Sequence, residues 1–187
     1  MARTEAPRGI AAGFKMKRCR EIAANAKIPA RASPGHSEES FFCSKASQSI
    51  GAMDPSELPE LSEYLKVEAF ENGEVVCQQG EAGDRVHFIE RGRARVSFRP
   101  SHAEEETTLG TLCPGTMFGE MSILDRRPRS ATVRAEGDLS CKVLHLGDFD
   151  RLCRDRPELA LKLLRGMGQE LSKRIRIGNR IASELGD

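Results

Sequence analysis

Short alternations of apolar and polar residues fill the middle of the chain. Clear runs span residues 86–88, 94–98 and 139–143, where every second residue is apolar. A period of two is typical of strands that bury one face against a core. The middle of the chain is therefore predicted to contain short, half-buried β-strands, with Ala94, Val96 and Phe98 on the buried face of one of them.

Glycines separate these apolar runs at intervals of a few to eighteen residues, at positions 73, 80, 83, 92, 110 and 115. Many short strands joined by glycine turns are typical of a β-sandwich or jelly roll. The polar stretch Arg99–Glu106 is predicted to be a hairpin loop. The expected fold is therefore mainly β, a jelly roll (double-stranded β-helix) with flanking helices.

Helical patterns lie at both ends of this β region. A capped helix start is expected at Asp54–Leu58, with an amphipathic stretch to about Leu65. After Gly147 a short helix is expected near 148–153, and a long one is expected to begin at Pro157, because proline is favoured at the first helical position.

The long C-terminal helix carries a heptad pattern, formed by Leu164, Met167, Leu171, Arg174, Gly178, Ile181 and Leu185. Spacings that alternate between three and four residues are typical of a helix that packs along one seam. The first half is expected to pack on the β domain. The continuation of the seam suggests a partner helix as well, so a homodimer through this helix is a possible assembly.

Charge divides the chain into two parts. Residues 1–52 hold nine Lys/Arg and four Asp/Glu, whereas residues 53–187 hold 20 and 24. Residues 1–52 are predicted to be a basic, disordered N-terminal extension. A basic arm for anionic partners is the alternative, as is a translation start at Met53. The acidic balance of residues 53–187 disfavours nucleic-acid binding by that part.

Several classes of protein are disfavoured by what the sequence lacks. It has no apolar run of the roughly 20 residues that span a bilayer and no apolar signal core, so a cytoplasmic location is expected. It has no P-loop, no His-Glu-x-x-His site and no Gly-x-Ser-x-Gly motif. The expectation is a protein that is not an enzyme, with no metal site and no catalytic cofactor.

One stretch, from Phe118 to Ala135, combines groups that suit a sugar phosphate. Glu120 follows a glycine, and Arg129 comes nine residues later, before two small residues. A carboxylate suits vicinal hydroxyls, and a guanidinium suits a phosphate in bidentate geometry. On spacing alone, an ordinary surface salt bridge between Glu120 and Arg129 is the simpler interpretation.

This stretch resembles the phosphate-binding cassette of cyclic-nucleotide-binding domains, found in the catabolite activator family, cyclic-nucleotide-dependent kinases and gated channels. The shared pattern is Phe-Gly-Glu, a short helical turn, then Pro-Arg-Ser-Ala, here Phe118–Glu120 and Pro128–Ala131. The glycines within 73–92 match the family's β-roll in order. The C-terminal segment is similar in style to the domains appended to bacterial transporters and glutaminases.

The resemblance implies a sensor of cAMP or cGMP over residues 53–187, with its C-terminal helix from about 157. It places Glu120 at the ribose 2′-hydroxyl and Arg129 at the cyclic phosphate. The rest of the expected site consists of the amides of Gly119 and Glu120, with Phe118, Met121, Ser130, Ala131 and Arg174. Ser130 is compatible with either base.

Arg174 is expected where the long helix reaches over the base of the nucleotide. It interrupts the heptad seam, and we hypothesise that it couples ligand binding to helix pairing; a side chain that extends to solvent is the simpler alternative. The DNA-binding module that follows this helix in the catabolite activator family is not expected here, because the sequence given ends at Asp187. The expected output is an effect on an unidentified effector protein. The alternative function is a ligand-free fold that serves as a dimerisation or scaffold unit.

Overall fold

The computed structural model describes residues 57–101 and 105–184. The predicted N-terminal extension, residues 1–52, lies outside the described residues, as do the expected helix start at 54–56 and the last seam residue, Leu185. The side chains of Ile181, Ala182 and Glu184 are also not described.

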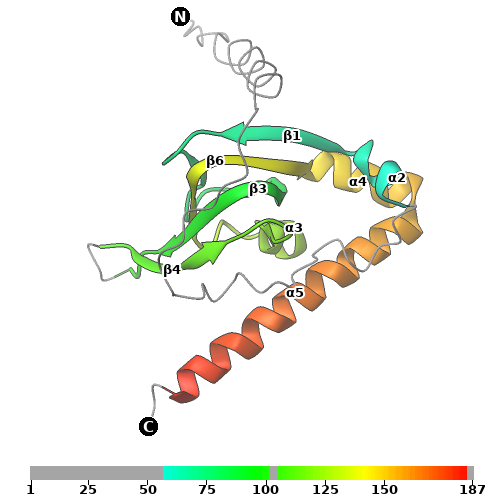
Figure 1. Cartoon of the computed structure of the whole chain (residues 1–187). Helices are drawn as coiled ribbons and strands as arrows, with labels where there is room; N and C mark the ends of the chain where they lie inside the picture. Colours follow the sequence, from blue (N-terminus) through cyan, green and yellow to red (C-terminus); the bar gives the residue numbers. More distant parts are fainter. Residues whose placement is uncertain (1–56, 102–104, 185–187) are drawn as a thin grey trace, which may run out of the picture. The chain divides into compact units, whose positions relative to one another are not determined.

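Six strands form one antiparallel sheet around two long central strands (Figure 1). The central strands are β3 (Arg85–Phe98) and β6 (Thr132–His145), which pair with each other. The strands β1 (Leu65–Phe70) and β2 (Val75–Cys77) pair with β6. The strands β4 (Thr107–Leu112) and β5 (Met117–Phe118) pair with β3. The mainly β architecture predicted from the alternating pattern is confirmed.

The first half of β3 is buried on both faces, unlike the half-buried strand that the alternation predicts. Val86 and Phe88 join a core cluster with residues of the helices, whereas Ile89 belongs to a second cluster among the strands. Helices cover one face of this part of the sheet and other strands cover the opposite face, so residues on both faces are buried.

The predicted alternation of burial fails at the end of β3, where Ser97 is buried and Phe98 is 36% exposed. The extra residue at this point lies in the neighbouring strand, since the register with β4 passes over Leu109 while β3 stays in step with β6. Phe98 is the last residue of β3, and the buried Ser97 hydroxyl donates to Oε2 of Glu106 at 2.7 Å. The expected inward position of Phe98 is therefore wrong, whereas Ala94 is fully buried as predicted.

Four described helices flank the sheet. They are α2 (Leu58–Ser62), α3 (Glu120–Asp125), α4 (Leu146–Asp155) and α5 (Pro157–Glu184). α2 is a single short helix, and the chain is already in β1 at Leu65, where an amphipathic helical stretch was expected to end. No helix in the described part of the chain is long and apolar enough to cross a membrane.

The long helix α5 packs on the domain along the first half of its predicted seam. Leu163 and Met167 are fully buried in the core cluster that includes α4, and Leu164 packs against the same cluster. Farther along, Arg174 lies with one-fifth of its side chain exposed. The seam from Leu164 to Arg174 therefore faces the chain's own β domain.

Candidate functional site

A sharp turn connects β5 to α3 at the point where the sequence predicts the cassette to begin. Gly119 adopts a left-handed conformation, with φ of 81°. A Cβ at this position would lie 2.4 Å from Nη1 of Arg129 and 2.9 Å from the carbonyl oxygen of Arg85. Glycine is required here both by the backbone conformation and by the close approach of the arginine.

Arg129 is a buried cation held by main-chain carbonyls. Its Nη1 donates to the Gly119 oxygen and its Nη2 donates to the Arg85 oxygen, each at 2.9 Å. Gly83 makes room for this arrangement, since a Cβ there would lie 2.9 Å from Cζ of Arg129. Only 7% of Arg129 is exposed, and no Asp or Glu of the described segments lies within ion-pair distance of it.

Glu120 is the first residue of α3 and is 1% exposed. Its Oε1 accepts a hydrogen bond from Nη1 of Arg174 at 2.8 Å, but its Oε2 is buried and has no partner among the residues that the structure describes. Burial raises the pKa of the Glu120 carboxyl above its ordinary value, while the Arg174 guanidinium acts in the opposite direction.

Arg174 reaches the site from α5 rather than extending to solvent. Besides its bond to Glu120, it donates through Nη2 to the Met117 carbonyl oxygen, and its Nε lies 3.5 Å from Oε1 of Glu170. The position of Arg174 over the cassette was predicted. Its ion pair with Glu120 was not, because contact between residues 54 positions apart depends on the tertiary fold.

The predicted site residues come together around one cavity of about 190 Å³. All eight line it: Phe118, Gly119, Glu120, Met121, Arg129, Ser130, Ala131 and Arg174. Phe118 is buried, whereas Met121 is 43% exposed. The sequence analysis missed the other residues of the wall. They are Ser122 of α3 and five strand residues, Cys77, Val96, Leu109, Leu112 and Val133. These side chains, mostly apolar, carry no chemical signature in the sequence.

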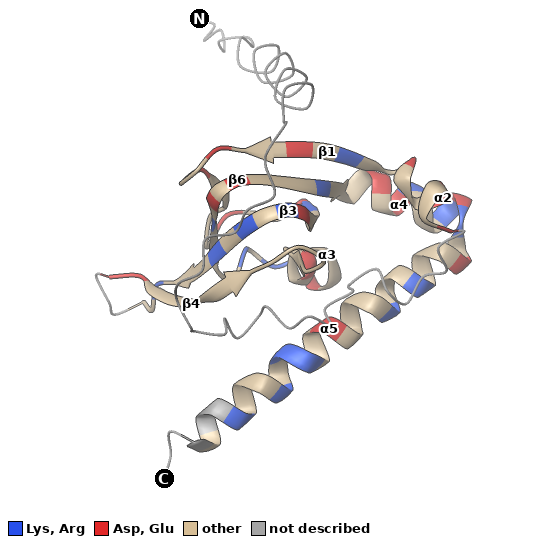
Figure 2. Ribbon diagram, in the orientation of Figure 1, with Lys and Arg blue, Asp and Glu red and all other residues tan. Residues whose placement is uncertain are grey.

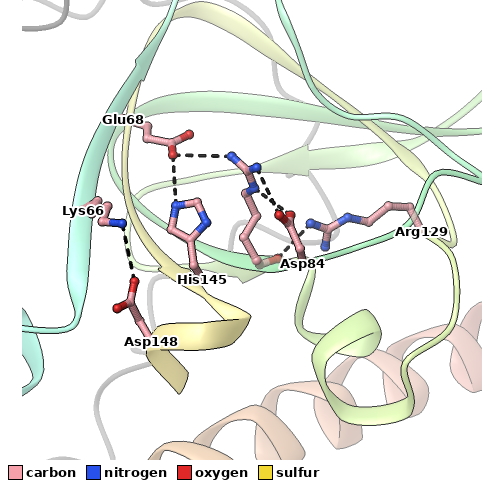
Figure 3. Close-up of polar contacts among 7 residues, drawn as sticks. Lys66, Glu68, Asp84, Arg129, His145 and Asp148 are labelled. Carbon is pink, nitrogen blue, oxygen red and sulfur yellow. Dashed lines mark hydrogen bonds and ion pairs between the residues drawn. The ribbon is translucent and has the colours of Figure 1, made fainter. Parts of the chain in front are cut away.

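Charged side chains form a network behind Arg129 (Figure 3). The Arg85 guanidinium donates through Nε to Oδ1 of Asp84 at 2.8 Å, and its Nη1 lies 3.5 Å from Oε1 of Glu68. The same Glu68 oxygen lies 3.5 Å from Nε2 of His145. The hydrogen bond from Arg85 lowers the pKa of Asp84. This network restrains Arg85, whose carbonyl oxygen holds Arg129.

His87 lies under the site as a buried, uncharged ring. It stacks on Phe118 with 4.6 Å between ring centroids and 3° between planes, and neither ring nitrogen has a partner among the described residues. Burial, with the nearby cations Arg129 and Arg85, lowers the pKa of His87 to about 3.

The low pKa of His87 should make the fold sensitive to acid. In the unfolded chain the His87 imidazole binds a proton near its ordinary pKa of 6.5, whereas in the folded chain it does so only near pH 3. The free energy of unfolding is therefore highest above pH 6.5 and decreases as the pH falls from 6.5 towards 3. At pH 5 the loss is about 2 kcal/mol. Urea unfolding at pH 7 and pH 5 should show that His87→Leu reduces the difference between the two pH values by about this amount.

The matched control for this measurement is His145→Leu, at a histidine whose side chain is 26% exposed. That variant should keep the acid sensitivity of the wild type. An equal pH 7 to pH 5 difference in wild type and His87→Leu would mean that His87 is not the group that destabilises the fold in acid.

No group of three or more His, Cys, Asp or Glu side chains is arranged to hold a metal ion within the described ranges. The polar groups that line the cavity are instead two guanidinium groups, a carboxylate and two hydroxyls, from Arg129, Arg174, Glu120, Ser122 and Ser130. These groups suit an organic ligand that carries an anion and hydroxyl groups.

Comparison with known proteins identifies the same segment. Residues 67–156 match the family model described as the cyclic nucleotide-binding domain. A cyclic nucleotide-gated potassium channel of Mesorhizobium japonicum is 38% identical over 108 residues, which are 58% of this chain and 28% of the channel. A cAMP-dependent protein kinase regulatory subunit of Blastocladiella emersonii is 35% identical over 103 residues, 55% of this chain and 25% of that protein.

The matched segment thus spans about a quarter of the length of each of these curated relatives. Among solved structures, a cyclic nucleotide-binding domain from Methylobacillus flagellatus superposes with a TM-score of 0.66 and 26% identity, over 71% of this chain and 74% of that chain. The agreement of sequence, fold and family model confirms the predicted resemblance and the jelly-roll class. Residues 67–156 belong to the cyclic nucleotide-binding domain family.

Proposed function

We propose that this domain is a regulatory sensor that binds cAMP or cGMP in the cavity between α3, β6 and α5. In this proposal Arg129 binds the cyclic phosphate, and Glu120 binds the ribose 2′-hydroxyl. The domain supplies no reaction chemistry. It acts by changing its conformation, and so its contacts with an effector polypeptide, when the nucleotide is bound.

The observation that carries the proposal is the buried guanidinium of Arg129. A buried charge is costly unless it is paired, and no carboxylate in the described part of the chain pairs with this one. Two of its five N–H groups donate to carbonyl oxygens, so N–H groups remain for an anion. A cyclic phosphate supplies that anion with the geometry that guanidinium groups favour.

The second support is the free oxygen of Glu120. Its Oε2 is buried without a hydrogen-bond donor from any described residue, although Oε1 is bound by Arg174. A ribose hydroxyl can donate to Oε2 while the ion pair with Arg174 stays in place. The anion site and the hydroxyl site line the same cavity, as a sugar phosphate requires.

The size of the cavity implies that the long helix moves when ligand binds. Its volume of about 190 Å³ is below the roughly 300–1,000 Å³ of pockets that hold small molecules. Arg174 forms part of its wall and is the wall residue that α5 contributes. We infer that the nucleotide enters as this part of α5 shifts outward, and that this shift is the signal to the effector.

Titration calorimetry of the full chain with cAMP and with cGMP tests the proposal directly. Saturable binding of one nucleotide per chain, for at least one of the two, is the expected result. Absence of binding for both nucleotides by a folded protein would favour the alternative, a ligand-free dimerisation or scaffold unit.

The role of Glu120 predicts a preference for ribose. We expect 2′-deoxy-cAMP to bind roughly tenfold more weakly than cAMP, because a hydrogen bond to a charged group contributes about 1.5–3 kcal/mol. Glu120→Gln should shrink this difference, since a neutral amide makes a weaker bond. Competition titrations of both nucleotides against both proteins measure it. Equal affinities for the ribo and deoxy forms in the wild type would assign Glu120 only its structural role with Arg174.

A further inference from the structure

The outward face of α5 has a regular chemical pattern that the nucleotide site does not use. Leu161, Gly168 and Ile175 are seven residues apart, and all three are exposed, Leu161 at 49% and Ile175 at 62%. Half-buried Leu164 and Leu171 lie at three-residue offsets beside them. A seven-residue apolar repeat forms a straight stripe along a helix, as in helices that pack against a second helix.

Small residues lie within this stripe. Gly168 and Ser172 are both exposed on this face. Small side chains let the axis of a neighbouring helix approach closely, with the larger Leu161 and Ile175 packing on either side. The stripe has the shape of a helix-docking surface.

Arg165, Lys173, Arg176 and Arg180 are exposed, and the helical period places them along one side of the apolar stripe. Figure 2 shows that Lys and Arg recur along α5. Lys173 lies 3.8 Å from Glu170, but no described acidic residue forms an ion pair with Arg165, Arg176 or Arg180. Most cations elsewhere in the described domain, such as Arg95 with Glu136 or Lys142 with Glu90, do have such partners. Three of the four cations on this side of α5 therefore have no ion-pair partner among the described residues.

We propose that this face of α5, defined as Leu161, Arg165, Gly168, Ser172, Ile175 and Arg176, docks an acidic amphipathic helix of another protein. Glutamates beside the partner's apolar stripe would pair with Arg165 and Arg176, and its apolar residues would cover Leu161 and Ile175. A second copy of this chain fits less well, because two such faces would bring cations together. A membrane surface also fits less well, since α5 has no aromatic residue and only a narrow apolar stripe.

Binding to a helix of defined composition tests this proposal. The probe is a fluorescein-labelled 21-residue helix with leucine at its a and d positions and glutamate at e and g, titrated with the full chain and followed by anisotropy. Saturable binding is expected. It should weaken roughly tenfold in Arg165→Glu/Arg176→Glu and several-fold in Ile175→Ser, because both charge pairing and apolar burial are lost.

The matched control is Arg91→Glu/Arg154→Glu, the same charge change at two exposed arginines on β3 and α4. It should bind the probe like the wild type, and a probe with lysine in place of glutamate should not bind. Equal weakening in the control, or no effect of Arg165→Glu/Arg176→Glu, overturns the proposal. It is also overturned if the acidic helix fails to bind while phosphatidylserine vesicles or a DNA duplex bind through these arginines, or if sedimentation shows that the same face forms homodimers.

Discussion

Arg129→Ala should weaken binding of the cyclic nucleotide at least tenfold, and by up to about a hundredfold, while the domain remains folded. A charge-assisted contact to phosphate contributes about 1.5–3 kcal/mol, and more when it is shielded from water. In this protein the guanidinium is almost completely buried, so the contact is at the favourable end of that range. Calorimetry of the variant, with thermal unfolding in parallel, measures both quantities.

Two further variants separate charge from geometry at this position. Arg129→Lys keeps the positive charge but cannot span the Gly119 and Arg85 oxygens as the two guanidinium nitrogens do, so it should lose most of the affinity as well. Arg127→Ala, at an exposed arginine of the same loop, should bind like the wild type. Unchanged affinity in a folded Arg129→Ala protein would remove Arg129 from the nucleotide site.

The cassette could be predicted from the sequence because its chemistry is local. The turn at Gly119, the carboxylate of Glu120 and the arginine nine residues later lie on one short segment, and the segment's own backbone brings them together. A pattern of residue types at fixed spacing is enough to identify such an arrangement. The β domain could be predicted for a similar reason, since alternation depends on neighbours in the chain.

Contacts between distant segments could not be predicted in the same way. The Glu120–Arg174 pair joins α3 to α5, and the Arg129–Arg85 contact joins the cassette to β3. The exposure of Phe98, the last residue of β3, depends on what covers that end of the sheet, which the alternation within β3 does not encode. The buried state of His87 depends on Phe118 and Phe70 packing against its ring.

These distant contacts also change the interpretation of the long helix. The heptad seam suggested a partner helix, but Leu164 and Met167 of that seam pack on the domain core, and Arg174 binds Glu120 of α3. The face left outside is a different one, with its own apolar stripe and its own charge. Under the proposed function, a shift of α5 on ligand binding would therefore move a surface suited to a partner and so pass on the signal.

Arg174→Leu should destabilise the domain by about 3 kcal/mol at pH 7.5, because it leaves the carboxylate of Glu120 buried without its counter-charge. This loss of stability is at the low end of that for buried ion pairs, since one-fifth of the Arg174 side chain is exposed to solvent. Arg176→Leu is the control on the outward face of the same helix, and it should change stability by less than about 0.5 kcal/mol.

The pH dependence of this effect identifies its cause. The pKa of Glu120 is raised in the folded protein, and it should rise further when Arg174 is removed. The Glu120 carboxyl therefore loses its proton at a lower pH in the unfolded chain than in the folded one. The stability of Arg174→Leu is then retained below the ordinary pKa of a glutamate and lost as the pH rises through the raised, folded-state value. Urea unfolding of Arg174→Leu relative to wild type should therefore show a larger deficit at pH 7.5 than at pH 5.

A second substitution completes the test. Adding Glu120→Gln to Arg174→Leu removes the buried charge, and the double variant should regain at least half of the lost stability, whereas independent residues would give additive losses. Recovery with a smaller pH dependence would establish that Arg174 serves as the counter-charge of the Glu120 carboxylate. A deficit that is equal at both pH values and additive with Glu120→Gln would instead assign the effect to lost packing of the arginine side chain against α3 and β5.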